Sequence, residues 1–312
     1  MSLVTEAAAV TSRRTRRRWG APWLFLLPAA LLFVAFLAIP VGYALYLSFR
    51  GLRVTGGGPF GARQETWVGL DNYAAAFTDP EFLAGFGRLA IYGIIAVPLT
   101  LGLALTFALL LDLPRVRGAR FSRTAIFLPY AVPGVVATLL WGFLYLPSTS
   151  PGNWLLRSVG LEGPDMLHGG MLYPSVANIA IWSGVGFNMI ILYTSLRGIP
   201  SDVYEAARLD GANEWHIAYR IKIPLVGPAL VLTGLFALIG TLQVYGEPTT
   251  LRPMTSAISQ TWVPLMTIYR DAFTRDDLSL AAASSVALAL GTLVVSVVLL
   301  RVTQKRSFGE SR

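Results

Sequence analysis

The side chains that most often carry catalysis or bind metals are scarce and isolated in this sequence. There is no cysteine among the 312 residues, which excludes disulfides, thiol catalysis and thiolate metal sites. The two histidines, His168 and His216, stand in polar segments without the neighbours that a metal site needs. The two lysines, Lys222 and Lys305, lack the glycine-rich loop of a Walker A nucleotide site. The sequence therefore predicts no metal, no nucleotide and no cofactor in this chain.

One polar stretch, residues 202–228 (DVYEAARLDGANEWHIAYRIKIPLVGP), lies between two long apolar blocks and has an internal pattern. The spacing Asp202-x-x-Glu205 matches a capping box and predicts a helix that begins at Asp202. Gly211 is the expected C-cap, and a second helical piece should run until Pro224 prevents its continuation. A connection between two membrane helices can be much shorter, so we expect this stretch to have a function of its own.

The spacing within this stretch resembles a known motif. A Glu-Ala-Ala triplet at 205–207 is followed after three residues by Gly211 and, nine residues later, by Ile-x-Ile-Pro at 221–224. This resembles the EAA loop of binding-protein-dependent ABC importer permeases, EAA-x3-G-x9-I-x-L-P, with Ile223 in place of leucine as the only departure. The alternative is an interfacial amphipathic helix with an ordinary capping box, which does not explain the break at Gly211 or the spacing to the proline.

The resemblance implies a role for each residue of the motif. Glu205 and Asp210 would contact an ATPase subunit, Gly211 would make the turn between two short helices, and Ala206 and Ala207 would allow close approach of the partner. Capping alone would also explain Glu205, and helix propensity alone would explain the two alanines. ATP and magnesium would be bound by the partner subunits.

The composition is that of an all-α, polytopic membrane protein. Hydrophobic residues make up 54% of the chain and charged residues 13%, and the mean hydropathy is +0.58. The net charge of +8 comes almost wholly from arginines at the ends of apolar blocks. We interpret these arginines as topology determinants that contact anionic lipid headgroups, and we expect no nucleic-acid partner.

Six apolar blocks predict six transmembrane helices. Residues 1–18 are expected to be a basic tail, 19–301 the membrane domain with its coupling loop at 202–228, and 302–312 a second tail. Prolines 28 and 40 are expected to kink or break the first span, and a short interfacial helix is expected around 153–156. The six spans are 19–49, 86–111, 121–146, 173–196, 224–245 and 278–300.

Arginine placement predicts the orientation of the spans. With both tails and the loops at 112–123 and 197–223 inside, seventeen of the 25 Lys and Arg residues lie on the cytoplasmic side, although the outer loops are longer. The middles of the spans contain no ionisable residue, whereas ion-coupled carriers normally have such groups. A transporter with neither an ion relay nor a nucleotide site must receive its energy from a partner.

The expected solute path lies at the end of the fifth span, Thr241–Glu247. Thr241 and Tyr245 are four residues apart and share a helix face, so Gln243 should project from another face. These two helix faces should not be turned toward the pore equally. In maltose-type permeases this part of span five contributes to the sugar site, which is the main reason to favour it.

Two further polar residues are candidates for the same path. Asn188 lies inside the fourth span, and Glu247 lies near the outer boundary, where it could instead contact the binding protein. The alternative is that Gln243 bonds a neighbouring helix and that Trp182 only packs or lies at the interface.

Most of the chain, about 23–300, resembles the carbohydrate-type subfamily of these permeases. The stretches VGLDNYAAAFTDPEF (68–82) and RTAIFLPYAVPGVVATLLWGFLY (123–145) are the closest matches. The resemblance implies a type I ABC importer permease fold, one half of a twelve-helix pore. Its partners would be a second permease, usually a different chain, two ABC ATPase subunits and an extracytoplasmic solute-binding protein.

One segment departs from that subfamily. The family usually has Gly-Gly-Pro after span five, whereas residues 248–254 read PTTLRPM here, which leaves the shape of the outer gate open.

The expected cargo is a sugar or a related polyol or glycoside. An importer for a non-carbohydrate solute, such as a polyamine, phosphate or a glycerol phosphodiester, is the main alternative. A membrane-embedded enzyme would need clustered acids, histidines or cysteines near one membrane face, and the sequence has none.

Overall fold

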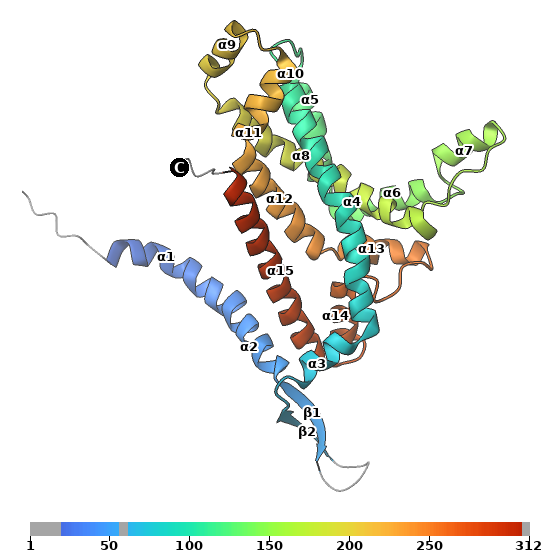
Figure 1. Ribbon diagram of the computed structural model, residues 1–312. Coiled ribbons are helices and arrows are strands. Elements are labelled where there is room, and N and C mark those ends of the chain that lie inside the picture. Colours follow the sequence, from blue (N-terminus) through green and yellow to red (C-terminus); the bar gives the residue numbers. More distant parts are fainter. Residues whose placement is uncertain (1–19, 56–61, 308–312) are drawn as a thin grey trace, which may run out of the picture. The chain divides into compact units, whose positions relative to one another are not determined.

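The computed structural model describes residues 20–55 and 62–307 (Figure 1). The basic tail predicted at 1–18 and the last residues of the tail at 302–312 lie outside this range. The described chain divides into two compact units, one ending at Tyr46 and the other beginning at Leu47, and each is described by itself.

The first unit is one apolar helical segment. Helix α1 (Gly20–Phe33) leads through a π-helical turn, Val34–Ala38, into α2 (Ile39–Ser48). Pro28 lies inside α1, and Pro40 is the second residue of α2, directly after Ile39. The chain is therefore helical through both prolines, and the break considered at these positions is not observed.

The second unit begins with elements that the sequence did not predict. Strands β1 (Arg50–Thr55) and β2 (Ala62–Trp67) form an antiparallel hairpin, and α3 (Asp71–Thr78) follows it. Helix α4 (Pro80–Leu111) is longer than the predicted span because Asp79 caps it, accepting a hydrogen bond from the amide of Glu81 at 2.8 Å, with proline at its first position.

The third predicted span is not a single straight helix. Helix α5 (Ala119–Phe127) passes through a 3-10 turn, Leu128–Ala131, before α6 (Gly134–Tyr145), and the two helical segments meet at 95°. Pro129 lies within this turn and Pro133 follows it, and neither can donate a backbone hydrogen bond, which favours the break there. The expectation of one helix over 121–146 was wrong.

Helices α7 (Pro151–Ser158) and α8 (Leu172–Arg197) follow, and α7 confirms the short helix predicted there. Helix α8 packs along α4 and is half buried within the chain. Gly186 allows α8 to approach α5, because a Cβ at this position would lie 2.3 Å from the carbonyl oxygen of Ile126.

The polar stretch between α8 and the next span is helical almost throughout. It contains α9 (Ser201–Leu209), α10 (Glu214–Ile217), a π turn at Ala218–Lys222 and α11 (Ile223–Leu225). Helix α12 (Gly227–Leu242) then turns away by 66°. In Figure 1, α9 and α10 lie at the end of α4 opposite to α3.

Two predictions about this stretch were wrong in detail. Helix α9 begins at Ser201 after an N-cap at Pro200, with no side-chain cap, so the capping box from Asp202 does not form. Pro224 does not end the second helical piece, which continues to Leu225 because the proline occupies the first turn of α11, where no donor is needed.

The connection between the last two spans is packed rather than a polar surface segment. Helix α13 (Gly246–Leu251) packs against α6, and α14 (Pro264–Phe273) leads to α15 (Leu278–Ser307). Leu251, Trp262 and Val263 are at most 2% exposed.

Four helices of the described chain are long and apolar enough to cross a membrane. Two bent pairs, α5 with α6 and α10–α11 with α12, bring the number to six if each pair is one span. The predicted all-α fold with six spans agrees with this arrangement, apart from the small hairpin.

Candidate functional site

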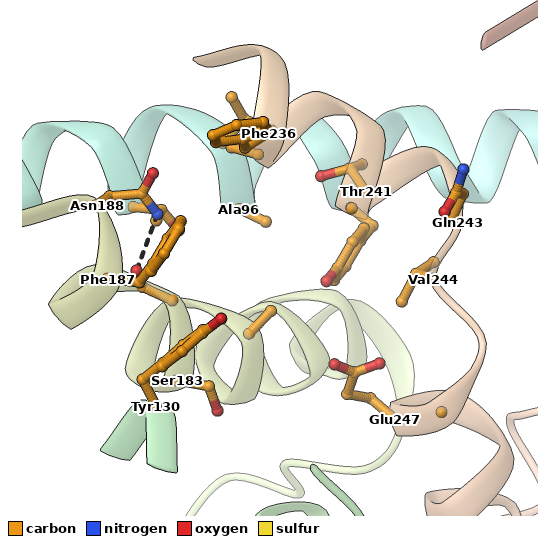
Figure 2. A pocket seen from close by; sticks show the side chains of 18 of the residues that line it. Ala96, Tyr130, Ser183, Phe187, Asn188, Phe236, Thr241, Gln243, Val244 and Glu247 are labelled. Carbon is orange, nitrogen blue, oxygen red and sulfur yellow. Dashed lines mark hydrogen bonds between the residues drawn. The ribbon is translucent and has the colours of Figure 1, made fainter. Parts of the chain in front are cut away.

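A cavity of about 430 Å³ lies between α4, α8 and the end of α12 (Figure 2). All five residues predicted for the solute path line it: Asn188, Thr241, Gln243, Tyr245 and Glu247. The structure thus brings these five residues together around one space, and their role in a solute path stays a prediction.

The geometry at the end of α12 differs from the expected helix face. Helix α12 ends at Leu242, and the backbone of Tyr245, at φ −150° and ψ −45°, is no longer helical. Because the chain is unwound here, Thr241, Gln243 and Tyr245 all line the cavity. The expectation that Gln243 must project elsewhere was wrong, since the four-residue spacing no longer decides direction once the helix has ended.

The side-chain amide of Asn188 makes a hydrogen bond through its nitrogen but not through its oxygen. It is 5% exposed, and its Nδ2 donates to the carbonyl oxygen of Gly184 at 2.8 Å, the bond drawn as a dashed line in Figure 2. Its Oδ1 is buried without a hydrogen-bond partner among the described residues. A buried acceptor without a partner is costly, so Oδ1 is available to a hydroxyl or amide donor in the cavity.

Aromatic faces line the other side of the cavity. Tyr130 and Phe187 are stacked with ring centroids 4.9 Å apart and planes at 18°, and Phe236 lies 6.4 Å from Phe187. Tyr130 is brought here by the bend between α5 and α6. These three rings were not predicted, because they come from separate parts of the chain. The prolines around Tyr130 were the only local indication of its position.

Glu247 is the one ionisable acid or base that lines the cavity, tyrosines aside. It lies in the first turn of α13, where the helix dipole favours a carboxylate. Figure 2 shows its carboxylate directed toward the space between the helices. Trp182, by contrast, packs edge-on against Trp141 at 5.9 Å and does not line the cavity.

The coupling loop predicted at 202–228 corresponds to α9 to α11, Ser201–Leu225, and this segment keeps the name; it presents most of its motif residues to solvent. Glu205, Ala206, Asp210 and Gly211 are exposed and Ala207 is half buried. Two large apolar side chains in the same loop, to which the sequence pattern gave no role, are Leu209 at 90% and Trp215 at 84% exposed. Solvent-exposed apolar groups of this size on a short loop favour contact with another surface.

The turn in the coupling loop is a complete Schellman motif. The amide of Ala212 donates to the carbonyl of Ala207 at 2.9 Å, and the amide of Gly211 donates to that of Arg208 at 3.0 Å. Gly211 has φ +84°, a left-handed conformation that glycine adopts without strain. The predicted helix end at Gly211 is thus confirmed.

The same loop is held across its turn by a side-chain pair. Arg208 Nη2 lies 3.1 Å from Glu214 Oε1, but both side chains are more than 40% exposed. An exposed pair of this kind adds at most about 1 kcal/mol. The backbone of the turn therefore determines the angle between α9 and α10 more than the ion pair does.

No group of three or more His, Asp or Glu residues placed to hold a metal occurs in the described part of the chain. The cavity is suited to binding a small polar molecule through hydrogen bonds and ring stacking, and the loop is suited to docking.

Comparison with known proteins identifies the family of the chain. Residues 104–306 match the family described as binding-protein-dependent transport system inner membrane component. The chain is 31% identical, over 93% of its length and 96% of the relative, to the sn-glycerol-3-phosphate transport system permease protein UgpA of Salmonella typhimurium strain LT2. It is 32% identical to the UgpA of Escherichia coli O6:K15:H31 strain 536, over 92% of this chain and 94% of the relative.

Solved structures share the fold. A chain of a bacterial ABC transporter involved in the import of the acidic polysaccharide alginate superposes with a TM-score of 0.74 at 22% identity, over 91% of this chain and 95% of that one. A chain of the alginate transporter in complex with an alginate pentasaccharide-bound periplasmic protein gives 0.75 at 19% identity, over 92% and 94%. Because the family model matches residues 104–306 and these relatives match over more than nine-tenths of the chain, the chain belongs to the family of inner membrane components of binding-protein-dependent transport systems.

Proposed function

We propose that the cavity beside α12 is the solute path of an ATP-driven importer and that the solute is a neutral sugar or a related polyol or glycoside. The observation that carries this proposal is the cavity lining: several amide and hydroxyl groups, a stacked aromatic pair and a single carboxylate. Sugars are bound by such a combination, because their hydroxyls pair with amides and carboxylates while their C–H faces cover aromatic rings.

The charge in the cavity disfavours a phosphate ester. Glu247 is negative, and no Lys, Arg or His is among the lining residues. Two like charges about 6 Å apart at an effective dielectric constant of about 20 repel each other by roughly 3 kcal/mol. That is about a hundredfold in affinity. The names of the UgpA relatives include sn-glycerol 3-phosphate, but identity near 31% does not carry their solute to this cavity.

The single carboxylate also keeps a cationic solute as the second candidate. A polyamine would be attracted to Glu247, but each of its other ammonium groups would need a partner in the membrane interior. A neutral solute requires no such partner.

The coupling loop would receive the energy for transport. Glu205 and Asp210 would contact an ABC ATPase, with the exposed Leu209 and Trp215 supplying apolar contact. Two ATPase subunits would bind ATP and magnesium, and this chain would bind neither. A second permease chain and an extracytoplasmic solute-binding protein would complete the complex.

The orientation follows from the same assignment. The membrane domain over 19–301 would be multi-pass in a prokaryotic cell membrane, with the tails and the coupling loop in the cytoplasm, as the arginine distribution favours. The cavity would then open toward the outer side for solute delivered by the binding protein.

Uptake by the reconstituted complex tests the solute class. Proteoliposomes would be offered maltose, trehalose, sn-glycerol 3-phosphate and spermidine, with Glu247→Gln and Glu247→Lys compared with the wild type. Glu162→Gln removes the same charge from an exposed loop residue and serves as the matched control.

We expect uptake of a neutral sugar that falls at least tenfold in Glu247→Lys and is unchanged in Glu162→Gln. Uptake of sn-glycerol 3-phosphate alone by the wild type would overturn the proposal. Preferential uptake of spermidine that is lost in Glu247→Gln would replace the sugar by the polyamine.

A further inference from the structure

A buried ion pair joins the coupling loop to the end of α4. Lys222 Nζ lies 2.7 Å from Asp112 Oδ2, and the two side chains are 5% and 4% exposed. Arg197, at the end of α8, places Nη1 3.8 Å from the other carboxylate oxygen of Asp112, although its own side chain is 66% exposed. The carboxylate therefore lies between the ends of three segments.

The position of Asp112 is unfavourable unless a cation is present. Asp112 is the C-cap of α4, where the helix dipole disfavours a negative charge. Lys222 and Arg197 compensate that charge. Burying two charges is itself costly, and a well-packed apolar pair is often equally stable. The stability of the fold therefore does not explain why this pair is charged. A role that needs a directional contact between these two positions would explain it.

The coupling loop has few other attachments to the rest of the chain. From Ser201 to Leu225 its buried residues are Ile217 and Lys222, and α9 has no buried residue. Tyr204, on α9, places its ring 5.1 Å from Lys222 Nζ. The Tyr204 hydroxyl is buried without a hydrogen-bond partner in the described chain. Burial raises the pKa of Tyr204, and the nearby Asp112 carboxylate raises it further.

Helix α4 continues from this pair to the cavity. Tyr92, Ala96 and Thr100 of α4 line the cavity, and the helix is uninterrupted until Asp112. At 1.5 Å per residue, Thr100 lies about 18 Å along the helix from the ion pair. Pro98 lies between Ala96 and Thr100, but no proline lies between Thr100 and Asp112, so a displacement at Asp112 would reach the cavity wall first at Thr100.

We propose that the Asp112–Lys222 pair, with Tyr204 stacked on the lysine, is the contact through which movement of the coupling loop reaches α4 and the wall of the cavity. This inference rests on the proposed coupling function of the loop. Asp112, Lys222 and Tyr204 are positioning residues and do not touch ATP or solute. Ile217 is buried as well, and Trp215 and Leu110 line one small pocket between the loop and α4, so the pair is the charged contact between the two segments beside apolar ones.

Double substitution separates this role from simple stabilisation. Asp112→Asn or Lys222→Met alone leaves a buried charge unpaired and is expected to destabilise the chain, so single variants are not informative. Asp112→Leu combined with Lys222→Met removes both charges and keeps apolar volume. The matched control, Arg208→Gln with Glu214→Gln, removes the exposed ion pair of the same loop.

The readouts are complex yield, thermal midpoint, basal ATP hydrolysis and hydrolysis stimulated by the loaded binding protein. For the double apolar variant we expect normal yield, midpoint and basal rate, with stimulated hydrolysis and uptake at least fivefold lower. The control pair should behave as the wild type. The charge-reversed variant, Asp112→Lys with Lys222→Asp, should recover part of the stimulation.

Wild-type stimulation in a well-assembled double apolar variant would overturn the inference. A charge-reversed variant no better than the double apolar one would also overturn it. Cross-linking of the loop to the ATPase distinguishes failure of this inference from failure of the proposed function. If a cross-linker attached at Ala206→Cys still forms a product with the ATPase, the loop docks as proposed and only the proposed connection to α4 is wrong.

Discussion

The coupling loop and the cavity are built in opposite ways. The loop takes its geometry from consecutive residues: a Schellman turn at Gly211, two short helices and exposed side chains. The cavity takes its geometry from packing, which brings Tyr130, Asn188 and Glu247 together from three separate elements. Substitutions in the loop should therefore lower stimulated ATP hydrolysis without altering solute binding. Substitutions in the cavity should weaken solute binding without altering the contact with the ATPase.

The largest effect is expected from Gly211→Val. A β-branched residue at φ +84° is strained by about 1–3 kcal/mol, which favours a different angle between α9 and α10. We expect stimulated ATP hydrolysis to fall at least tenfold while the complex still assembles, as measured on purified complex in proteoliposomes. Gly211→Asn is the matched control, since asparagine tolerates left-handed conformations, and it should retain most activity. Normal stimulation in an assembled Gly211→Val complex would contradict the role of the turn.

Asn188→Leu, in the cavity, should impair solute uptake and leave ATP hydrolysis intact. Leucine keeps the volume but removes the buried Oδ1 that lacks a partner, which relieves a cost of about 1–3 kcal/mol. The thermal midpoint should be unchanged or higher, while uptake at low solute concentration falls about tenfold and basal ATP hydrolysis is preserved. A variant that is less stable but transports normally would place Asn188 among packing residues.

Arg208→Gln should have a small effect and so sharpen the contrast within the loop. The pair with Glu214 is exposed and contributes at most about 1 kcal/mol. We expect stimulated hydrolysis within about twofold of the wild type. A loss as large as that of Gly211→Val would mean that side-chain charge, rather than the backbone turn, sets the loop angle.

The smallest effect lies outside both regions, in the loop before α8. Hydrogen bonds from His168 and from the amide of Leu167 lower the pKa of Asp165 from its usual 3.8. Because the folded pKa is depressed, the stabilisation is present above pH about 3.8 and is lost as the pH falls through the folded pKa.

Hydrogen exchange at Leu167, corrected for the intrinsic rate, measures this effect. Asp165→Asn should raise the exchange rate at pH 7, and the difference from the wild type should shrink below pH 3.8. Transport should be unaffected. A change in uptake would show that this loop belongs to the solute path after all.

The loop was predictable because its pattern is local. The triplet at 205–207, Gly211 and Pro224 lie within one turn-containing segment, and glycine at a left-handed position can be anticipated from sequence. The predicted start of α9 was wrong by one residue. The capping-box spacing is present in the sequence, but the helix begins at Ser201 with Pro200 as its N-cap.

Most of the predicted cavity residues are neighbours in the chain, and Asn188 was added only as a polar residue inside the fourth span. Thr241, Gln243, Tyr245 and Glu247 follow one another at the end of α12, but the unwinding after Leu242 has no clear indication in the sequence. The position of Tyr130 depends on the 95° bend between α5 and α6. Prolines in the sequence indicate that a helix breaks, but they do not indicate the direction of the bend. The buried pair of Asp112 and Lys222 likewise depends on packing between distant segments.

Photo-cross-linking tests the central claim most directly, and the absence of native cysteine makes the labelling specific. A photoreactive maleimide would be attached at Ala206→Cys in the exposed part of the coupling loop, and at Ser256→Cys in the connection between α13 and α14. Cross-linking would be performed in membranes that contain the whole transporter. We predict a product between Ala206→Cys and the ATPase subunit, and none between Ser256→Cys and that subunit. A product with the ATPase from Ser256→Cys but not from Ala206→Cys would contradict the assignment of the coupling loop.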